Sequence, residues 1–149
     1  MPQSLSKNYI HLVFSTHGRA DMIPKDRMGE VFSYISAVLT DKGCPTLCVN
    51  GTQNHVHILF ILSRNTALAD AVRLAKNNTS KWINSHLPVP LFKWQSGYGA
   101  FSVSQSLIQK TTEYIMNQEE HHRKLTFKDE YKKLLELYKI EYDEQYMWD

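Results

Sequence analysis

Four stretches of the chain show the apolar and polar pattern of β-strands. Residues 8–15, NYIHLVFS, alternate and are rich in β-branched and aromatic side chains, which favours a first strand. Residues 45–50 and residues 55–62, HVHILFIL, predict two more strands, and the polar turn between them makes the pair a hairpin. The 55–62 segment is apolar on both faces after its first residues, which indicates a central strand. Residues 98–104, YGAFSVS, predict the fourth strand.

Apolar residues recur at helical spacing in the segments between and after these strands. Helices are expected from Pro24 to Gly43, over 67–85, over 106–122 and over 126–138. The order of elements is then strand, helix, strand, strand, helix, strand and further helices. It predicts an α+β fold, namely a ferredoxin-like split βαβ antiparallel sheet with helices on one face and C-terminal helices added.

Length and charge limit the number of domains and the class of partner. The 149 residues suit one domain over 1–149, in which 106–122 is one helix and 126–149 a C-terminal helix and tail. Seventeen Lys and Arg against fifteen Asp and Glu give a net charge of +2. This balance does not suit a protein that coats DNA non-specifically, so any DNA contact must use a local basic face.

The cysteines and the hydropathy pattern indicate a cellular setting. Cys44 and Cys48 are too few for a disulfide scaffold, which favours a reducing compartment. No segment approaches the roughly 18 consecutive apolar residues of a membrane span. A cytoplasmic protein without membrane contact is therefore expected.

Two histidines stand two positions apart at the start of the 55–62 strand. Side chains of a strand alternate, so His55 and His57 point to the same face. Two imidazoles on one face can chelate a divalent metal ion. The alternative is a pair of unrelated polar residues near a strand end. Leu59 and Ile61 continue the same face, which places the histidines at the margin of a covered surface.

A second polar pair lies on the expected helix 106–122. Tyr114 and Gln118 are four residues apart and therefore neighbours on one helical face. Thr111 and His121 lie near the same stripe, which is a poor core face and needs a polar partner. A metal site opposite the two histidines would supply that partner. The alternative is a solvent-exposed polar face with a half-buried tyrosine.

Together the two pairs suggest a metal centre with neutral ligands. Imidazoles, an amide oxygen and a phenol leave the full positive charge on the ion, which suits a Lewis acid acting on a phosphate oxygen. Mixed nitrogen and oxygen ligands suit Mg²⁺ or Mn²⁺ as readily as Zn²⁺. A rival hypothesis is a structural Cys₂His₂ zinc site made by Cys44, Cys48, His55 and His57. The simpler reading of both cysteines is a small buried side chain.

Basic residues form three clusters that could contact phosphates. The alternative for each cluster is a solvated helix face. The residues expected to contact DNA are Arg19, Arg73, Lys76, Lys81, Arg123 and Lys124.

These motifs resemble those of a known family, the single-tyrosine His-hydrophobe-His (HUH) transposases of small bacterial insertion sequences, which include the REP-associated tyrosine transposases. HLVFSTHGR resembles the first strand and turn of that family, QNHVHILF its histidine strand, GYGAFSVS the strand before the tyrosine helix, and EYIMNQEEHH that helix. The turn Thr16-His17-Gly18-Arg19 departs from the pattern, because relatives often carry more basic residues there.

The resemblance implies roles for these residues. His55, His57 and Gln118 match the metal ligands, with Mg²⁺ or Mn²⁺ as the ion, and Tyr114 matches the nucleophile. The implied reaction is cleavage of single-stranded DNA to a 5′-phosphotyrosine and a free 3′-hydroxyl, followed by strand transfer. The implied partners are DNA with hairpin ends and a second copy of the chain, with an active site that could be shared within a homodimer.

Two other functions remain open at this stage. One is a domesticated hairpin-DNA-binding nuclease that keeps the fold but no longer transposes. The other is a metal-dependent phosphodiesterase in which water attacks and Tyr114 is structural.

Overall fold

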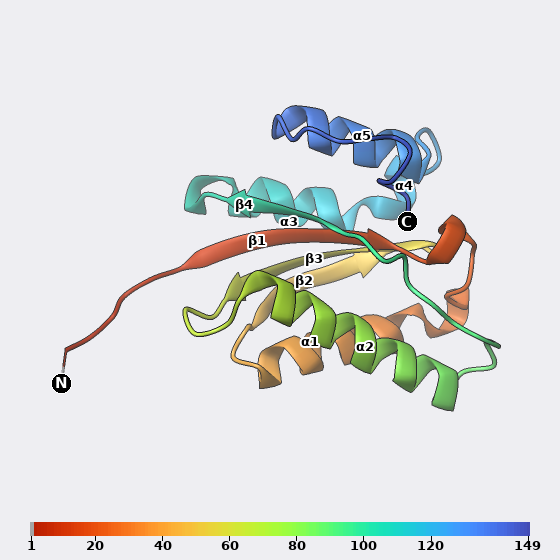
Figure 1. Cartoon of the computed structure of the whole chain (residues 1–149), viewed down its shortest axis with the longest axis horizontal. Helices are drawn as coiled ribbons and strands as arrows, with labels where there is room; N and C mark the ends of the chain where they lie inside the picture. The colour runs from red at the N-terminus through yellow and green to blue at the C-terminus, as the bar shows by residue number, and fades with distance from the viewer. Residues whose placement is uncertain (1) are drawn as a thin grey trace.

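A four-stranded antiparallel sheet forms the middle layer of the protein (Figure 1). The computed structural model describes residues 2–149. The strands are β1 (Asn8–Ser15), β2 (Thr46–Gly51), β3 (His55–Leu62) and β4 (Gly99–Val103). Their order, β2-β3-β1-β4, with a helix after β1 and another after β3, is the split βαβ arrangement, so the predicted fold class is confirmed.

Two long helices cover one face of the sheet. They are α1 (Met28–Asp41) and α2 (Leu68–His86), which lie together beneath the strands in Figure 1. The short 3₁₀ helix η2 (Lys25–Arg27) follows Pro24, so α1 itself begins later than Pro24. This side holds the largest hydrophobic core, to which Leu12, Phe14, Ile58 and Phe60 contribute from the strands.

The opposite face of the sheet is covered by the C-terminal third of the chain. After η3 (Gln105–Leu107) come α3 (Ile108–Met116), α4 (Gln118–His121) and α5 (Phe127–Leu137), which lie above the sheet in Figure 1. Ile115 packs with Tyr9 and Leu59, while α5 packs on Val13 and Phe101. Both faces of the sheet are therefore enclosed, and polar residues on the upper face lie inside the protein.

The helix expected over 106–122 is divided in the structure. It begins at Ile108 and is interrupted at Asn117, whose backbone angles (φ −102°, ψ 23°) are not helical. The side chain of Asn50 on β2 donates to the carbonyl of Ile115 over 2.9 Å. In a continuous helix that carbonyl would accept from residue 119. This long-range contact competes with the helical hydrogen bond, and local periodicity does not reveal it.

The turn between β2 and β3 places His55. At Gly51 a β-carbon would lie 2.2 Å from the backbone oxygen of His55, so only glycine fits without movement of the turn. Thr52 N–H donates to the same oxygen over 3.1 Å, which closes the turn.

Gly51→Ala is expected to lower the free energy of unfolding by about 2–3 kcal/mol, because the clash involves backbone and cannot be relieved by a rotamer change. Urea unfolding would measure the loss. Gly29→Ala is the matched control, since a β-carbon there meets nothing within 4 Å, and its effect should stay below about 1 kcal/mol. Equal effects of the two substitutions would contradict this account of the turn.

None of the helices within residues 2–149 is long and apolar enough to cross a membrane.

Candidate functional site

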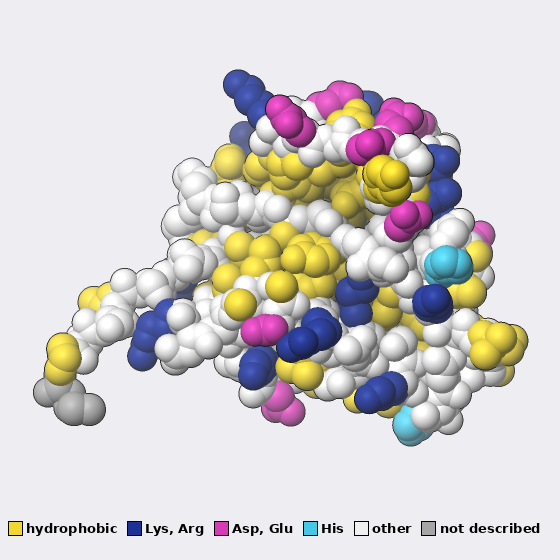
Figure 2. Space-filling view, in the orientation of Figure 1, with side chains coloured by type: hydrophobic (Ala, Val, Ile, Leu, Met, Phe, Trp, Pro, Cys, Tyr) yellow, Lys and Arg dark blue, Asp and Glu magenta, His cyan; other side chains and the backbone are white. Residues whose placement is uncertain are grey.

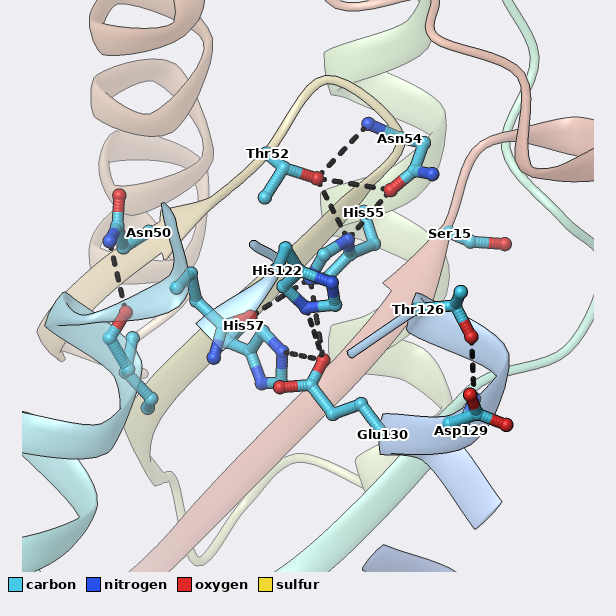
Figure 3. A network of polar contacts seen from close by, with 12 residues as sticks. Ser15, Asn50, Thr52, Asn54, His55, His57, His122, Thr126, Asp129 and Glu130 are labelled. Carbon is cyan, nitrogen blue, oxygen red and sulfur yellow. Dashed lines mark hydrogen bonds and ion pairs between the residues drawn. The ribbon is translucent and has the colours of Figure 1, made fainter. Parts of the chain in front are cut away.

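Polar side chains from three segments meet beneath the C-terminal helices. His55 and His57 open β3 and point to the sheet face that α3, α4 and α5 cover, and neither side chain is exposed (Figure 3). Gln118 at the start of α4 and Glu130 of α5 reach the same point from above. The structure thus brings together the two pairs that the sequence places far apart.

The orientation of His55 is fixed by the hairpin turn. Its Nδ1 lies 2.8 Å from Asn54 Oδ1 and 2.9 Å from Thr52 Oγ1. The Asn54 carbonyl can only accept, so Nδ1 carries the proton. Burial and then the neighbouring His57 lower the pKa of His55 to about 3, so the ring is neutral at pH 7. Its Nε2 therefore presents a lone pair.

That lone pair faces oxygen atoms. His55 Nε2 lies 2.9 Å from Gln118 Oε1 and 3.4 Å from Glu130 Oε1. Gln118 Nε2 is directed to the Tyr114 carbonyl at 3.5 Å, which leaves the amide oxygen toward the histidine. The nitrogen lone pair and the two oxygens converge with no proton between them. A cation at this point would stabilise the arrangement.

His57 is held from behind by His11, a residue that sequence reasoning missed. His11 Nε2 and His57 Nδ1 are 2.8 Å apart. Burial, then the neighbouring His57, lowers the pKa of His11 to about 3, so His11 is neutral and its ring can accept from His57. A metal-binding imidazole is commonly oriented by such a contact at its second nitrogen. The signal in the sequence was a histidine in the middle of a strand that is otherwise largely apolar.

The phenol of Tyr114 lies at the same cluster. Its hydroxyl donates to Glu130 Oε2, and its ring lies 5.8 Å from that of His57, centroid to centroid. The Tyr114 ring also packs against that of His121, with ring centroids 4.7 Å apart. Burial first, and then the charge of Glu130, raises the pKa of Tyr114 well above its ordinary value. The phenol is therefore protonated at neutral pH.

Glu130 and His122 complete the group and were not among the residues expected from sequence. Glu130 Oε1 lies 3.0 Å from Nε2 of both His57 and His122. Burial alone would raise the pKa of Glu130, but hydrogen bonds from His122 and His57 outweigh it and hold the pKa well below its usual range. The sequence signal was an acidic residue on the apolar stripe of a helix, between Phe127 and Leu134.

This group has the composition of a metal site. Ligand atoms of His55, His122 and Glu130 lie within 4.8 Å of one another, and imidazole with carboxylate suits first-row divalent ions. A buried His-His-Glu group that could bind a metal is therefore present. The rival Cys₂His₂ zinc site is wrong, because Cys44 lies in the core beneath the sheet whereas both histidines point above it.

Two hollows in the surface adjoin the cluster. Their volumes are about 430 and 510 Å³, and His122 and Arg123 line both. The side chain of His122 is 14% exposed, whereas that of His55 is completely buried. The buried cluster is thus closest to solvent at His122.

The basic residues expected to contact DNA lie in different settings. Arg73 and Lys81 are exposed on α2, over which Lys and Arg side chains gather in Figure 2, while acidic side chains gather over α5. Arg123, which also pairs with Glu120 at 3.3 Å, lines both hollows, and Lys124 lines the larger one. Arg19 places its guanidinium 4.9 Å from the ring centroid of Trp148.

Lys76 is in a different position from the one its sequence cluster suggested. It is buried, and its ammonium donates to the backbone carbonyls of Gln95, Ser96 and Gly97 at 2.6, 3.1 and 3.0 Å. Burial lowers its pKa to about 8, which leaves it charged at pH 7. The long side chain crosses the edge of the α2 stripe, so helical spacing alone does not reveal its burial.

Lys76→Met is expected to lower the free energy of unfolding by about 3 kcal/mol, because three carbonyls lose a charged donor. Lys81→Met on the exposed face of the same helix should cost less than about 0.5 kcal/mol. Thermal or urea unfolding of both variants measures the difference. Unchanged stability of the Lys76 variant would show that the ammonium is dispensable to the fold.

The fold and the cluster define an α+β protein with a metal-competent histidine and carboxylate group beside a tyrosine. The sequence model described as "Transposase IS200 like" matches residues 4–118, and the chain belongs to this family. The family is one of DNA transposases, enzymes that cut DNA and transfer strands. The matched range contains His55, His57, Tyr114 and Gln118 and ends before α5.

Solved structures show the same fold. One is a protein from Deinococcus radiodurans R1 whose description proposes a transposase; it shares 19% identity at a TM-score of 0.63, covering 79% of this chain and 98% of that one. Another is described as a REP-associated tyrosine transposase bound to a REP hairpin; it shares 12% identity at a TM-score of 0.62, covering 82% of this chain and 73% of that one. None of the curated protein sequences compared with the chain matches it.

Proposed function

We propose that the protein is a transposase that cuts single-stranded DNA with Tyr114. The observation that carries the proposal is the contact of Tyr114 with His57 and Glu130, in the cluster that also holds His55, in a chain from this family. In the proposed step the phenol oxygen attacks phosphorus and the bond to the 3′ oxygen breaks. The products are a 5′-phosphotyrosine and a free 3′-hydroxyl. Attack of a 3′-hydroxyl on this ester reverses the step and joins strands without ATP.

His55, His57 and Gln118 are proposed to hold a divalent ion, Mg²⁺ or Mn²⁺. Their support is the convergence of His55 Nε2 and Gln118 Oε1 at 2.9 Å and the orientation of both histidines by contacts at Nδ1. When bound, the ion would polarise a phosphate oxygen and stabilise the charge that develops on it. Asn54 and His11 would keep the two rings directed at that ion, and Glu130 Oε2 accepts the proton of the phenol in its hydrogen bond.

The proposed substrate is DNA with hairpin ends, as in the structural relative described with a REP hairpin. The strand would enter at the hollows beside His122, where Arg123 and Lys124 can contact phosphates, with Arg19, Arg73 and Lys81 as further contacts. We propose that residues 1–149 act as one unit and that the protein is a homodimer. Since one chain brings Tyr114 to His57, each subunit would carry its own cluster.

A covalent adduct tests the proposal. Hairpin DNA labelled at its 3′ end is incubated with the protein and Mn²⁺, and the mixture is run on a denaturing gel. Tyrosine attached to the 5′ phosphate retains the downstream fragment, so the label should migrate with the protein. Cleavage without labelled protein would favour a phosphodiesterase that uses water, and hairpin binding without cleavage would favour a domesticated DNA-binding protein.

A further inference from the structure

The two oxygens of the Glu130 carboxylate face different functional groups. Oε1 lies among three imidazole nitrogens, 3.0 Å from His57 Nε2, 3.0 Å from His122 Nε2 and 3.4 Å from His55 Nε2. Oε2 accepts the hydroxyl of Tyr114. The carboxylate thus lies between the histidine cluster and the tyrosine.

We propose that Glu130 is a bridging ligand, with Oε1 bound to the metal ion and Oε2 holding the phenol of Tyr114. The inference rests on the proposed metal site and adds to it an anionic ligand from α5, outside the residues 4–118 that the family model matches. One side chain would then set the position of the nucleophile relative to the ion.

The spacing of the donor atoms fits a coordination shell. Ligand atoms about 2.0–2.2 Å from a common ion lie about 2.8–3.6 Å from one another in tetrahedral and octahedral geometry. The contacts of Glu130 Oε1 with the three imidazoles, at 3.0–3.4 Å, fall in this range, and so does the 2.9 Å between His55 and Gln118. Glu130 Oε1 could therefore hold the ion together with the proposed ligands.

Charge supports the same assignment. The side chain of Glu130 is 1% exposed, and its ion-pair partners within residues 2–149 are all histidines. One of them, His55, turns Nε2 toward the carboxylate, because its Nδ1 contacts Asn54 in the hairpin turn. Burial of a carboxylate is costly, and a bound divalent cation would offset that cost.

The position of Glu130 is imposed by the packing of α5. Thr126 caps the helix by accepting from Asp129 N–H at 3.2 Å, and Phe127 stacks on His55 with ring centroids 4.4 Å apart. One turn further on, Tyr131 lies against Gly99, where a β-carbon would be 2.6 Å from its ring. These contacts flank Glu130 on both sides, so the carboxylate is held at the cluster before any ion binds.

Manganese binding by the full chain tests the inference without reference to cleavage. Metal-free protein is titrated with Mn²⁺, and the free ion is followed by its electron paramagnetic resonance signal. Glu130→Gln should raise the Kd about 10-fold or more, since even outer-shell partners of metal ligands contribute 10- to 100-fold. Glu136→Gln, an exposed acid on the same helix, should leave the Kd unchanged. Tyr114→Phe should raise the Kd less than Glu130→Gln does, because the phenol would act on the ion only through the carboxylate that it holds.

The bridge to the tyrosine has its own readout. With 3-fluorotyrosine placed at residue 114, Mg²⁺ should shift the fluorine resonance of the wild-type chain. The shift should be lost in Glu130→Gln, while far-UV circular dichroism confirms that the variant is folded. Should the glutamine variant not fold, Glu130→Asp retains the charge but withdraws the carboxylate, and it should weaken binding and abolish the shift.

The outcomes separate this inference from the proposed function. Mn²⁺ binding that requires His57 but is equally tight in Glu130→Gln would overturn the bridging role and leave the proposed metal site intact. An equal loss of affinity in Tyr114→Phe would also overturn it, because the phenol would then be a ligand. A wild-type chain that binds no Mn²⁺ would overturn the metal site itself.

Discussion

Tyr114→Phe should abolish the covalent protein–DNA adduct while the protein still binds hairpin DNA with a Kd within about 3-fold of the wild type. The substitution removes one oxygen atom, and a phenylalanine ring can keep the packing against His57 and His121. The lost hydroxyl donates to Glu130 Oε2, so a small loss of stability, about 1–2 kcal/mol, is expected as well. Denaturing gels measure the adduct and fluorescence anisotropy measures DNA binding.

Tyr34→Phe is the matched control for this variant. Tyr34 lies on α1 and stacks on Trp82 of α2, on the opposite side of the sheet from the cluster. Its loss of a hydroxyl should leave adduct formation unchanged. An adduct of wild-type yield in Tyr114→Phe would show that another residue is the nucleophile.

Local pattern was sufficient to predict most of the fold. Alternation in 8–15 and the apolar run of 55–62 predicted β1 and β3 with their observed bounds, and the apolar run also predicted the central position of β3. The break at Asn117 was missed because the Asn50 side chain, distant in sequence, competes for the carbonyl of Ile115, and local periodicity does not reveal that contact. Periodicity reports which face of an element is buried, whereas a contact between distant residues depends on how elements are assembled.

The same distinction applies to the site. His55 and His57 were assigned to one face by strand geometry alone, and the structure places both on it. Glu130 and His11 were missed because each was read only within its own segment. An acidic residue on an apolar helical stripe and a histidine in a buried strand both require a polar partner. The sequence alone can single out Glu130 and His11 as residues that need a polar partner. Only the register of β1 with β3 and the docking of α5 show that their partner is the same cluster.

Removal of the metal ion should have an effect as large as loss of the tyrosine. Wild-type protein treated with a chelator is expected to lose cleavage by at least about 1000-fold, because the ion is proposed to supply several kcal/mol of charge stabilisation at the phosphate. Added Mn²⁺ should restore the activity. His57→Ala should show the same loss without restoration, since its Nε2 is a proposed ligand and its Nδ1 is already bound to His11 at 2.8 Å.

His86→Ala provides the comparison, because His86 lies at the exposed end of α2 and contacts Trp82, far from the cluster. It should cleave like the wild type and respond to the chelator in the same way. Circular dichroism must confirm that His57→Ala is folded. The His57 side chain is completely buried, so its truncation leaves a cavity beside His11. A folded His57→Ala protein that cleaves normally in excess chelator would contradict the metal site. The adduct would then have to form by hydrogen bonding and positioning alone, with Glu130 Oε2 as the nearest acceptor for the phenolic proton.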